Sequence, residues 1–273
     1  MATGVEVSKP SMEIRFQPAL LQEVIDSFIE KTEREGDPTY YKEFHELADP
    51  IYEKFTLDDR EAEFKKLYQY LFGIWGFSDI IRDAFNEFPE LKQRVGIVLV
   101  KGVLKEDQEG VDVLRKWGSV EHDLAKQFEE KGLKGVGIKL IPRRFYDPAL
   151  TRYCGHELLH IHDMLDRAFG YDPDTRVGQN PGEETLILHR YRILWNISVD
   201  SRLIASGKEP MLQKEDRFKE FRSWYRKIPP AQLKSVFEGL WQTSYFTHSE
   251  LVEMATDTLR ILDRAVDVEG GEI

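Results

Sequence analysis

Residues 147–170 read DPALTRYCGHELLHIHDMLDRAFG, a segment with helix signals at both ends. An aspartate at 147 can cap a helix, a proline at 148 suits its first turn, and Gly170 is a typical stop. In the middle of this segment, residues 156–160 form an HExxH sequence. Because His156 and His160 are four residues apart, they lie on one face of the predicted helix.

A strand is predicted before this helix, and a second long helix after it. Residues 136–141 alternate apolar with smaller or polar residues, which is typical of a half-buried strand. Pro142 follows directly and indicates that this strand lies at a sheet edge. Residues 171–183 are rich in Asp, Pro, Gly and Asn and predict a loop. The second helix is predicted over 184–205, with Gly207 as its stop.

Most of the remaining chain has the apolar spacing of helices. Leu91 to Leu104 contains a β-branched run bounded by glycines, which predicts a buried strand. A capping box is predicted at Thr247 and Glu250. Further helices are predicted over 18–34, 39–55, 58–72, 77–87, 109–131, 212–228, 230–242 and 248–266.

The predicted fold class is therefore α+β and predominantly helical. Residues 1–11 are expected to be a flexible tail, and 12–273 a single globular unit. Within this unit we expect a helical N-terminal half over about 12–131, a core over about 132–210, and C-terminal helices over about 211–273. No internal repeat or linker interrupts the sequence.

Charge and composition narrow the expected partners and location. The net charge of −11 argues against a general nucleic-acid binder, because phosphate binding needs a basic surface. No apolar stretch is long enough for a membrane span, and the N-terminus lacks the layout of a secretory signal. The single cysteine, Cys154, fits a reducing compartment. We therefore expect a cytoplasmic protein.

The HExxH sequence predicts a zinc site. Its spacing lets both imidazoles reach one Zn²⁺, and Glu157 is placed to act on a zinc-bound water. The alternative is that His156 and His160 are hydrogen-bonded to neighbouring carboxylates in a helix interface. A catalytic zinc needs a third protein ligand and an open position for water.

The second predicted helix offers polar residues for that third position. His189, Ile193, Asn196 and Asp200 fall within a stripe of about sixty degrees at one hundred degrees per residue. The rest of this helix is apolar nearly all round, so buried polar groups on it need a partner. A metal centre facing the stripe would supply one, and a hydrogen-bonded seam or an exposed face is the alternative.

The order of strand, HExxH helix, loop and second helix resembles the core of the zincin superfamily of metallopeptidases. Residues 195–200, WNISVD, also resemble the W-N-x-x-x-D pattern of a family of predicted metallopeptidases often found with von Willebrand factor A domains. The resemblance covers roughly residues 136–206, and no von Willebrand domain accompanies it here. It implies that Asp200 is the third ligand and that strand 136–141 pairs with an extended substrate.

Other residues compete with Asp200 for the third position. Glu183 and Glu184 are nearest to the glutamate ligand of gluzincins, but neither has the aspartate that accompanies it four residues later. Asp166 is at the last ligand position of a metzincin motif whose glycine is replaced by Asp163. Without that glycine the helix does not turn, so Asp166 would point away from the two histidines. Asp163 shares their face one turn further on and is better suited to orient an imidazole. His189 is the remaining rival.

The resemblance implies a zinc-dependent hydrolase, a metallopeptidase acting on a peptide or protein. Glu157 would be the general base. A donor for the developing oxyanion is expected among four residues between which the spacing does not choose: Tyr191, Arg192, Tyr245 and His248. The alternative is a catalytically inactive scaffold that binds a protein partner through its helical N-terminal half.

Overall fold

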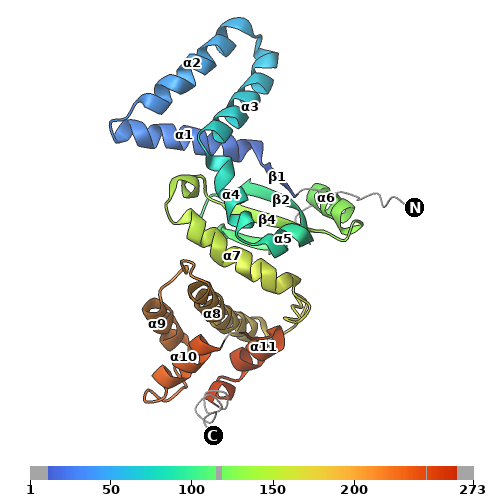
Figure 1. The fold of residues 1–273 in the computed structure, drawn as a ribbon, viewed down its shortest axis with the longest axis vertical. Helices are drawn as coiled ribbons and strands as arrows, with labels where there is room; N and C mark the ends of the chain where they lie inside the picture. Colours follow the sequence, from blue (N-terminus) through green and yellow to red (C-terminus); the bar gives the residue numbers. More distant parts are fainter. Residues whose placement is uncertain (1–11, 115–118, 244, 263–273) are drawn as a thin grey trace, which may run out of the picture. The chain divides into compact units, whose positions relative to one another are not determined.

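A four-stranded mixed sheet organises the first half of the chain (Figure 1). Its order is β1-β2-β4-β3, with β1 parallel to β2, β2 parallel to β4, and β3 antiparallel to β4. The inner strands are nearly continuously buried, which explains the apolar run in β2. The strands are β1 (Glu13–Phe16), β2 (Val95–Gly102), β3 (Gly110–Val113) and β4 (Lys134–Leu140).

The sheet confirms two predicted strands and corrects the predicted position of one of them in the sheet. The strands within Leu91–Leu104 and at 136–141 are present as β2 and β4. However, β4 has a neighbour on each side, so the prediction that 136–141 is an edge strand was wrong. The edges are β1, which was not predicted, and β3, which lies in the segment predicted as helix 109–131. β3 pairs with β4 and so takes up its second edge.

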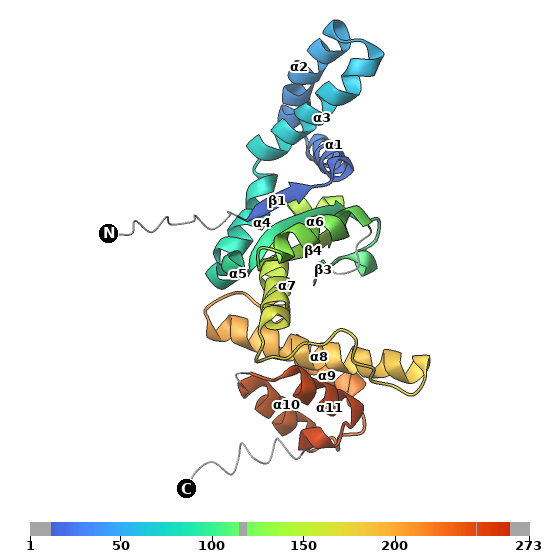
Figure 2. The same ribbon diagram turned by 90° about the vertical axis from the view of Figure 1, so that its right-hand side faces the viewer.

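Six helices accompany the sheet among the described residues of this first unit, and α1, α5 and α6 pack against it. Figures 1 and 2 show α2 and α3 meeting at the end far from the sheet, with α1 nearer to it. Proline stands at the first position of α1, where its missing N–H costs nothing. The helices are α1 (Pro18–Arg34), α2 (Thr39–Lys54), α3 (Leu57–Ile74), α4 (Phe77–Asn86), α5 (Pro89–Arg94) and α6 (Ser119–Glu129).

The second unit is entirely helical among its described residues. Its longest helix, α8 (Pro181–Ala205), lies between α7 (Leu150–Leu165) and three shorter helices, α9 (Lys214–Trp224), α10 (Leu233–Gln242) and α11 (His248–Thr256). α8 packs against α9, α10 and α11 and is hydrogen-bonded to α7 on its other side, which explains why it is apolar nearly all round. Asn180 caps α8 by accepting a hydrogen bond from the Glu183 amide, and the predicted capping box of Thr247 and Glu250 is confirmed.

The structure, a computed structural model, describes residues 12–114, 119–243 and 245–262. The predicted tail, residues 1–11, lies outside them. The chain divides into two compact units, Met1–Cys154 and Gly155–Ile273. The predicted single unit over 12–273 stays a prediction. In the described part of the chain, no helix is both long and apolar enough to cross a membrane.

The predominantly helical α+β class is as predicted. Helix α7 is shorter than expected, since it begins at Leu150 and ends at Leu165. Asp147 accepts a hydrogen bond from the Ala149 amide just before the helix starts. At the other end, Gly170 has a positive φ, the conformation for which glycine is favoured.

Candidate metal centre

The two histidines of the HExxH sequence are buried on one face of α7. His156 is 3% exposed and His160 is 7% exposed. Their Nε2 atoms lie 3.2 Å apart, so both rings direct the same nitrogen to one point. The helix explains this convergence, because residues four apart lie one turn from each other.

Asn196 of α8 supplies a third atom at the same point. Its Oδ1 lies 3.0 Å from Nε2 of His160 and 3.3 Å from Nε2 of His156. In a tetrahedral zinc site with bonds of about 2.0–2.1 Å to nitrogen, neighbouring donor atoms are about 3.3–3.4 Å apart. The triangle of Nε2, Nε2 and Oδ1 is therefore only slightly tighter than three corners of a zinc coordination tetrahedron.

The candidate zinc ligands are unusual because the third one is the side-chain amide of Asn196. Among the described residues, no three His, Cys, Asp or Glu side chains are grouped so that they could hold a metal ion. A three-ligand centre at this point therefore requires the Asn196 oxygen together with His156 and His160. The same contacts can also exist as hydrogen bonds without a metal, with one imidazole N–H donated to Asn196.

Asp200, the predicted third ligand, lies at the other edge of the His156 ring. Its Oδ1 is 2.8 Å from Nδ1 of His156. The carboxylate is fully buried and also accepts hydrogen bonds from the Met211 and Leu212 amides and from Nε of Arg217. Burial by itself would raise the pKa of Asp200, but the hydrogen bonds and charges of His156 and Arg217 hold it below its ordinary value.

This geometry gives Asp200 a different contact from the one expected. A carboxylate on Nδ1 receives the imidazole N–H and leaves Nε2 with its electron pair toward His160 and Asn196. That is the arrangement by which carboxylates orient metal-binding histidines in proteins. Asp200 is thus suited to orient His156 rather than to bind the metal itself.

The other rivals for the third position lie elsewhere. His189 is exposed, and its ring packs on Trp224 at 4.1 Å between centroids. Glu183 and Glu184 are in the first turn of α8, about 20 Å along the helix from Asn196. Asp166 follows the end of α7 and accepts hydrogen bonds from Ala168 and Tyr245.

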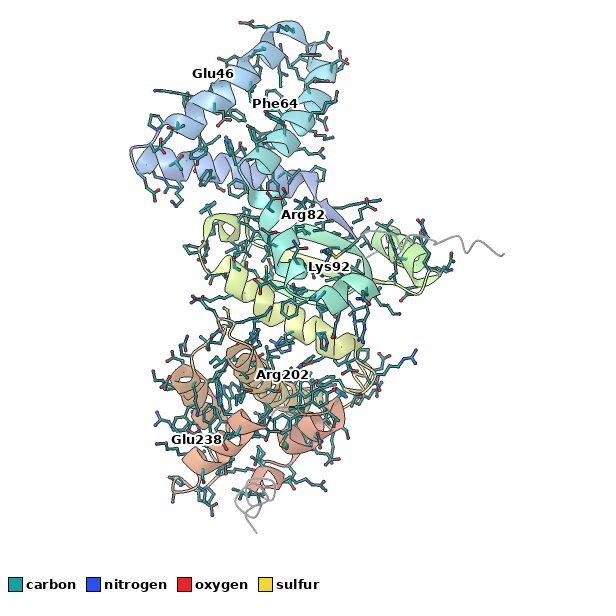
Figure 3. The ribbon with its side chains drawn as sticks, in the orientation of Figure 1. Glu46, Phe64, Arg82, Lys92, Arg202 and Glu238 are labelled. Atoms are coloured by element: carbon teal, nitrogen blue, oxygen red, sulfur yellow. The ribbon has the colours of Figure 1, made fainter. Side chains whose placement is uncertain are left out.

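Asp163 supports the site through a tryptophan instead of through an imidazole, contrary to expectation. Its fully buried carboxylate accepts a 2.7 Å hydrogen bond from Nε1 of Trp195 and two from Arg202. The Trp195 ring packs edge-on against His160, with 4.3 Å between ring centroids. Figure 3 shows Arg202 among the side chains between α7 and α8. Asp163 therefore fixes the Trp195 ring against which His160 packs.

The electrostatic environment favours the neutral form of His160. Burial holds the pKa of His160 well below its ordinary value. A neutral imidazole is the form that binds a metal. Glu157, the predicted general base, is half-buried and directly follows His156 on α7.

The four residues considered as oxyanion donors have other contacts or positions. Tyr191 is buried, with its hydroxyl 2.8 Å from Nδ1 of His248. Tyr245 donates to Asp166, and its pKa is raised to about 12, mainly by burial. Arg192 is exposed on α8. None of the four is thereby assigned as an oxyanion donor.

Comparisons with known proteins found no match for this chain. No protein-family model matches the sequence, and no curated protein and no solved structure matches it either. The resemblance of residues 136–206 to zincin metallopeptidases therefore stays a prediction.

Proposed function

We propose that the protein is a zinc-dependent hydrolase whose metal centre is built on α7 and α8. The observation that carries the proposal is the convergence of three donor atoms, Nε2 of His156, Nε2 of His160 and Oδ1 of Asn196. Two buried imidazoles four residues apart on one helix are a typical pair of zinc ligands, and the Asn196 oxygen that faces them offers a third donor atom.

Each residue of the site has a defined task in this proposal. His156, His160 and Asn196 would hold Zn²⁺, which when bound would lower the pKa of a water molecule and polarise a substrate carbonyl. Glu157 accepts the proton of the attacking water and returns it to the leaving group. Asp200 fixes the orientation of His156, and Asp163 fixes Trp195 against His160.

A peptide or protein is the proposed substrate. This part rests on the resemblance of the HExxH helix and of residues 195–200 to metallopeptidases, together with the role of Glu157. We further propose that the protein acts in the cytoplasm, since a single cysteine suits a reducing compartment. The net charge of −11 favours substrates other than nucleic acids.

A catalytically inactive scaffold is the second candidate function. It is favoured by one observation, namely that His156, His160 and Asn196 can satisfy one another by hydrogen bonds without a metal. In that case, the helical N-terminal half would be the surface for a protein partner.

Metal analysis tests the proposal most directly. We expect about one zinc per chain in the purified protein by elemental mass spectrometry, and none in a His156→Ala/His160→Ala variant. A His45→Ala/His189→Ala variant is the matched control, because His45 lies on α2 and His189 is exposed, with its ring packed on Trp224. Absence of zinc from the wild type after incubation with ZnCl₂ would favour the scaffold.

Hydrolysis separates the two functions further. A panel of fluorogenic peptides is the probe, with casein as a protein substrate. The zinc-loaded wild type is expected to cleave some of them, and cleavage should stop on treatment with a chelator and return when zinc is added back. Zinc binding without any cleavage would point to a metal-binding scaffold.

A further inference from the structure

Asp200 is held by groups that come from outside its own helix. Besides His156, it accepts hydrogen bonds from the Met211 amide at 2.9 Å, the Leu212 amide at 3.2 Å and Nε of Arg217 at 2.6 Å. These donors belong to the turn after α8 and to α9. The carboxylate therefore has four hydrogen bonds, which leave it no freedom to rotate away from His156.

Arg217 is the charged member of this group and is itself buried. Only 3% of its side chain is exposed, although arginine is almost never fully buried without a partner. Its guanidinium bridges two carboxylates, with Nε on Asp200 and an Nη atom on Glu220 at 2.7 Å. A charged hydrogen bond of this kind is stronger than one between neutral groups.

We propose that Arg217 is a positioning residue of the metal centre. By holding Asp200, it fixes the His156 ring with Nδ1–H donated to the carboxylate and Nε2 directed toward His160 and Asn196. This inference rests on the proposed function for its consequence in zinc binding. The ring orientation itself can be measured without zinc.

Contacts lead from Arg217 through Asp200 to the His156 ring. Arg217 contacts Asp200, Asp200 contacts Nδ1 of His156, and the other nitrogen of that ring faces the remaining ligands. If the guanidinium is removed, the carboxylate loses the cation that lies 2.6 Å from its Oδ2 and keeps only the neutral donors among these four contacts. The His156 ring then loses the acceptor that selects its tautomer, and the three donor atoms no longer converge.

Zinc affinity is the first readout of the test. We expect Arg217→Met to lower zinc affinity by about 10- to 100-fold, the usual effect of removing a partner that orients a ligand. Arg217→Lys keeps a cationic donor and should recover part of the loss. Arg222→Met is the matched control, because Arg222 is exposed on the same helix and should leave the affinity unchanged. Competition with a chromogenic chelator gives the values, corrected for the folded fraction measured by circular dichroism.

The second readout is NMR of the ¹⁵N-labelled histidines in the zinc-free protein. We expect the wild type to show His156 protonated at Nδ1, with a slowly exchanging proton that is lost in Arg217→Met and kept in Arg222→Met. His156 protonated at Nε2 in the wild type would overturn the inference, even if the Arg217 variants failed to fold. A folded Arg217→Met protein with wild-type zinc affinity and an unchanged His156 signal would also overturn it.

The two proposals can fail separately. If the wild type binds no zinc but shows the Nδ1 proton and loses it in Arg217→Met, then the positioning role stands and the metal centre does not. If zinc binds equally to the wild type and to Arg217→Met, and the variant keeps the Nδ1 proton of His156, then the metal centre stands and the positioning role does not.

Discussion

The Nε2 atoms of His156 and His160 lie 3.2 Å apart, with Oδ1 of Asn196 at 3.3 and 3.0 Å from them. Two of these atoms come from α7 and one from α8, so the cluster depends on how the two helices pack. The carboxylate of Asp200 lies one helical turn beyond Asn196 and contacts the opposite edge of the His156 ring. Asn196 and Asp200 thus have different roles although they belong to the same stripe of α8.

Substitution of Asn196 tests the assignment of the third ligand. We expect Asn196→Ala to lower zinc affinity by at least tenfold, whereas Asn196→Asp should retain zinc because a carboxylate oxygen is a common zinc ligand. Chelator competition measures both. Asn86→Ala, at an exposed asparagine on α4, is the control and should have no effect. Unchanged affinity in Asn196→Ala would remove Asn196 from the ligand set.

Substitution of Glu157 separates catalysis from metal binding. Glu157→Gln keeps the size of the side chain but removes its ability to accept a proton. We expect it to retain one zinc per chain and to lower kcat for peptide hydrolysis by about 10²- to 10⁴-fold, the usual contribution of a general base. Steady-state kinetics with parallel metal analysis checks this. A Glu157→Gln enzyme with wild-type kcat would contradict the proposed role of Glu157 as general base.

The contact between Trp195 and Asp163 should contribute to stability. Trp195→Phe retains an aromatic ring beside His160 but removes the N–H donated to the buried Asp163 carboxylate. Loss of that donor should lower the free energy of unfolding by about 1–3 kcal/mol, the range for a buried hydrogen bond to a charged group. Urea denaturation of the zinc-free protein measures the change. Trp75→Phe, which removes an indole N–H donated to the half-exposed Glu43, is the comparison and should have a smaller effect.

His248 should make the stability of the protein depend on pH. Burial lowers the pKa of its imidazole below the ordinary value, so between that lowered pKa and about 6.5 the unfolded chain binds a proton that the folded protein does not. Stability therefore falls as the pH drops below about 6.5, by at most about 1.4 kcal/mol per pH unit for one group.

Urea denaturation at pH 5.5 and 7.5 checks this expectation. Relative to the wild type, His248→Gln should be destabilised more at pH 7.5 than at pH 5.5. The reason is that the contribution of the neutral His248 imidazole to wild-type stability is already reduced at pH 5.5. Equal losses in His248→Gln at both pH values would contradict the prediction.

Much of the local structure could be predicted because it depends on neighbouring residues. The helices at 18–34 and 39–54, the strand within 91–104 and the capping box at Thr247 follow from short-range spacing and side-chain chemistry. The strand β3 was mistaken for the start of a helix, since four residues are too short to show a clear period. The position of β4 inside the sheet depends on β3 and could not be inferred once β3 was missed.

The sequence by itself determined that His156 and His160 share a helix face, and it grouped Asn196 and Asp200 on a stripe of the next predicted helix. Helix periodicity is sufficient for both results. Only the tertiary structure decided that Asn196 meets the Nε2 atoms while Asp200 meets Nδ1, and that Arg217 of α9 holds Asp200. The physical reason is that these contacts join helices whose packing is set by the whole core, and a one-turn difference along α8 reverses which edge of an imidazole a side chain reaches.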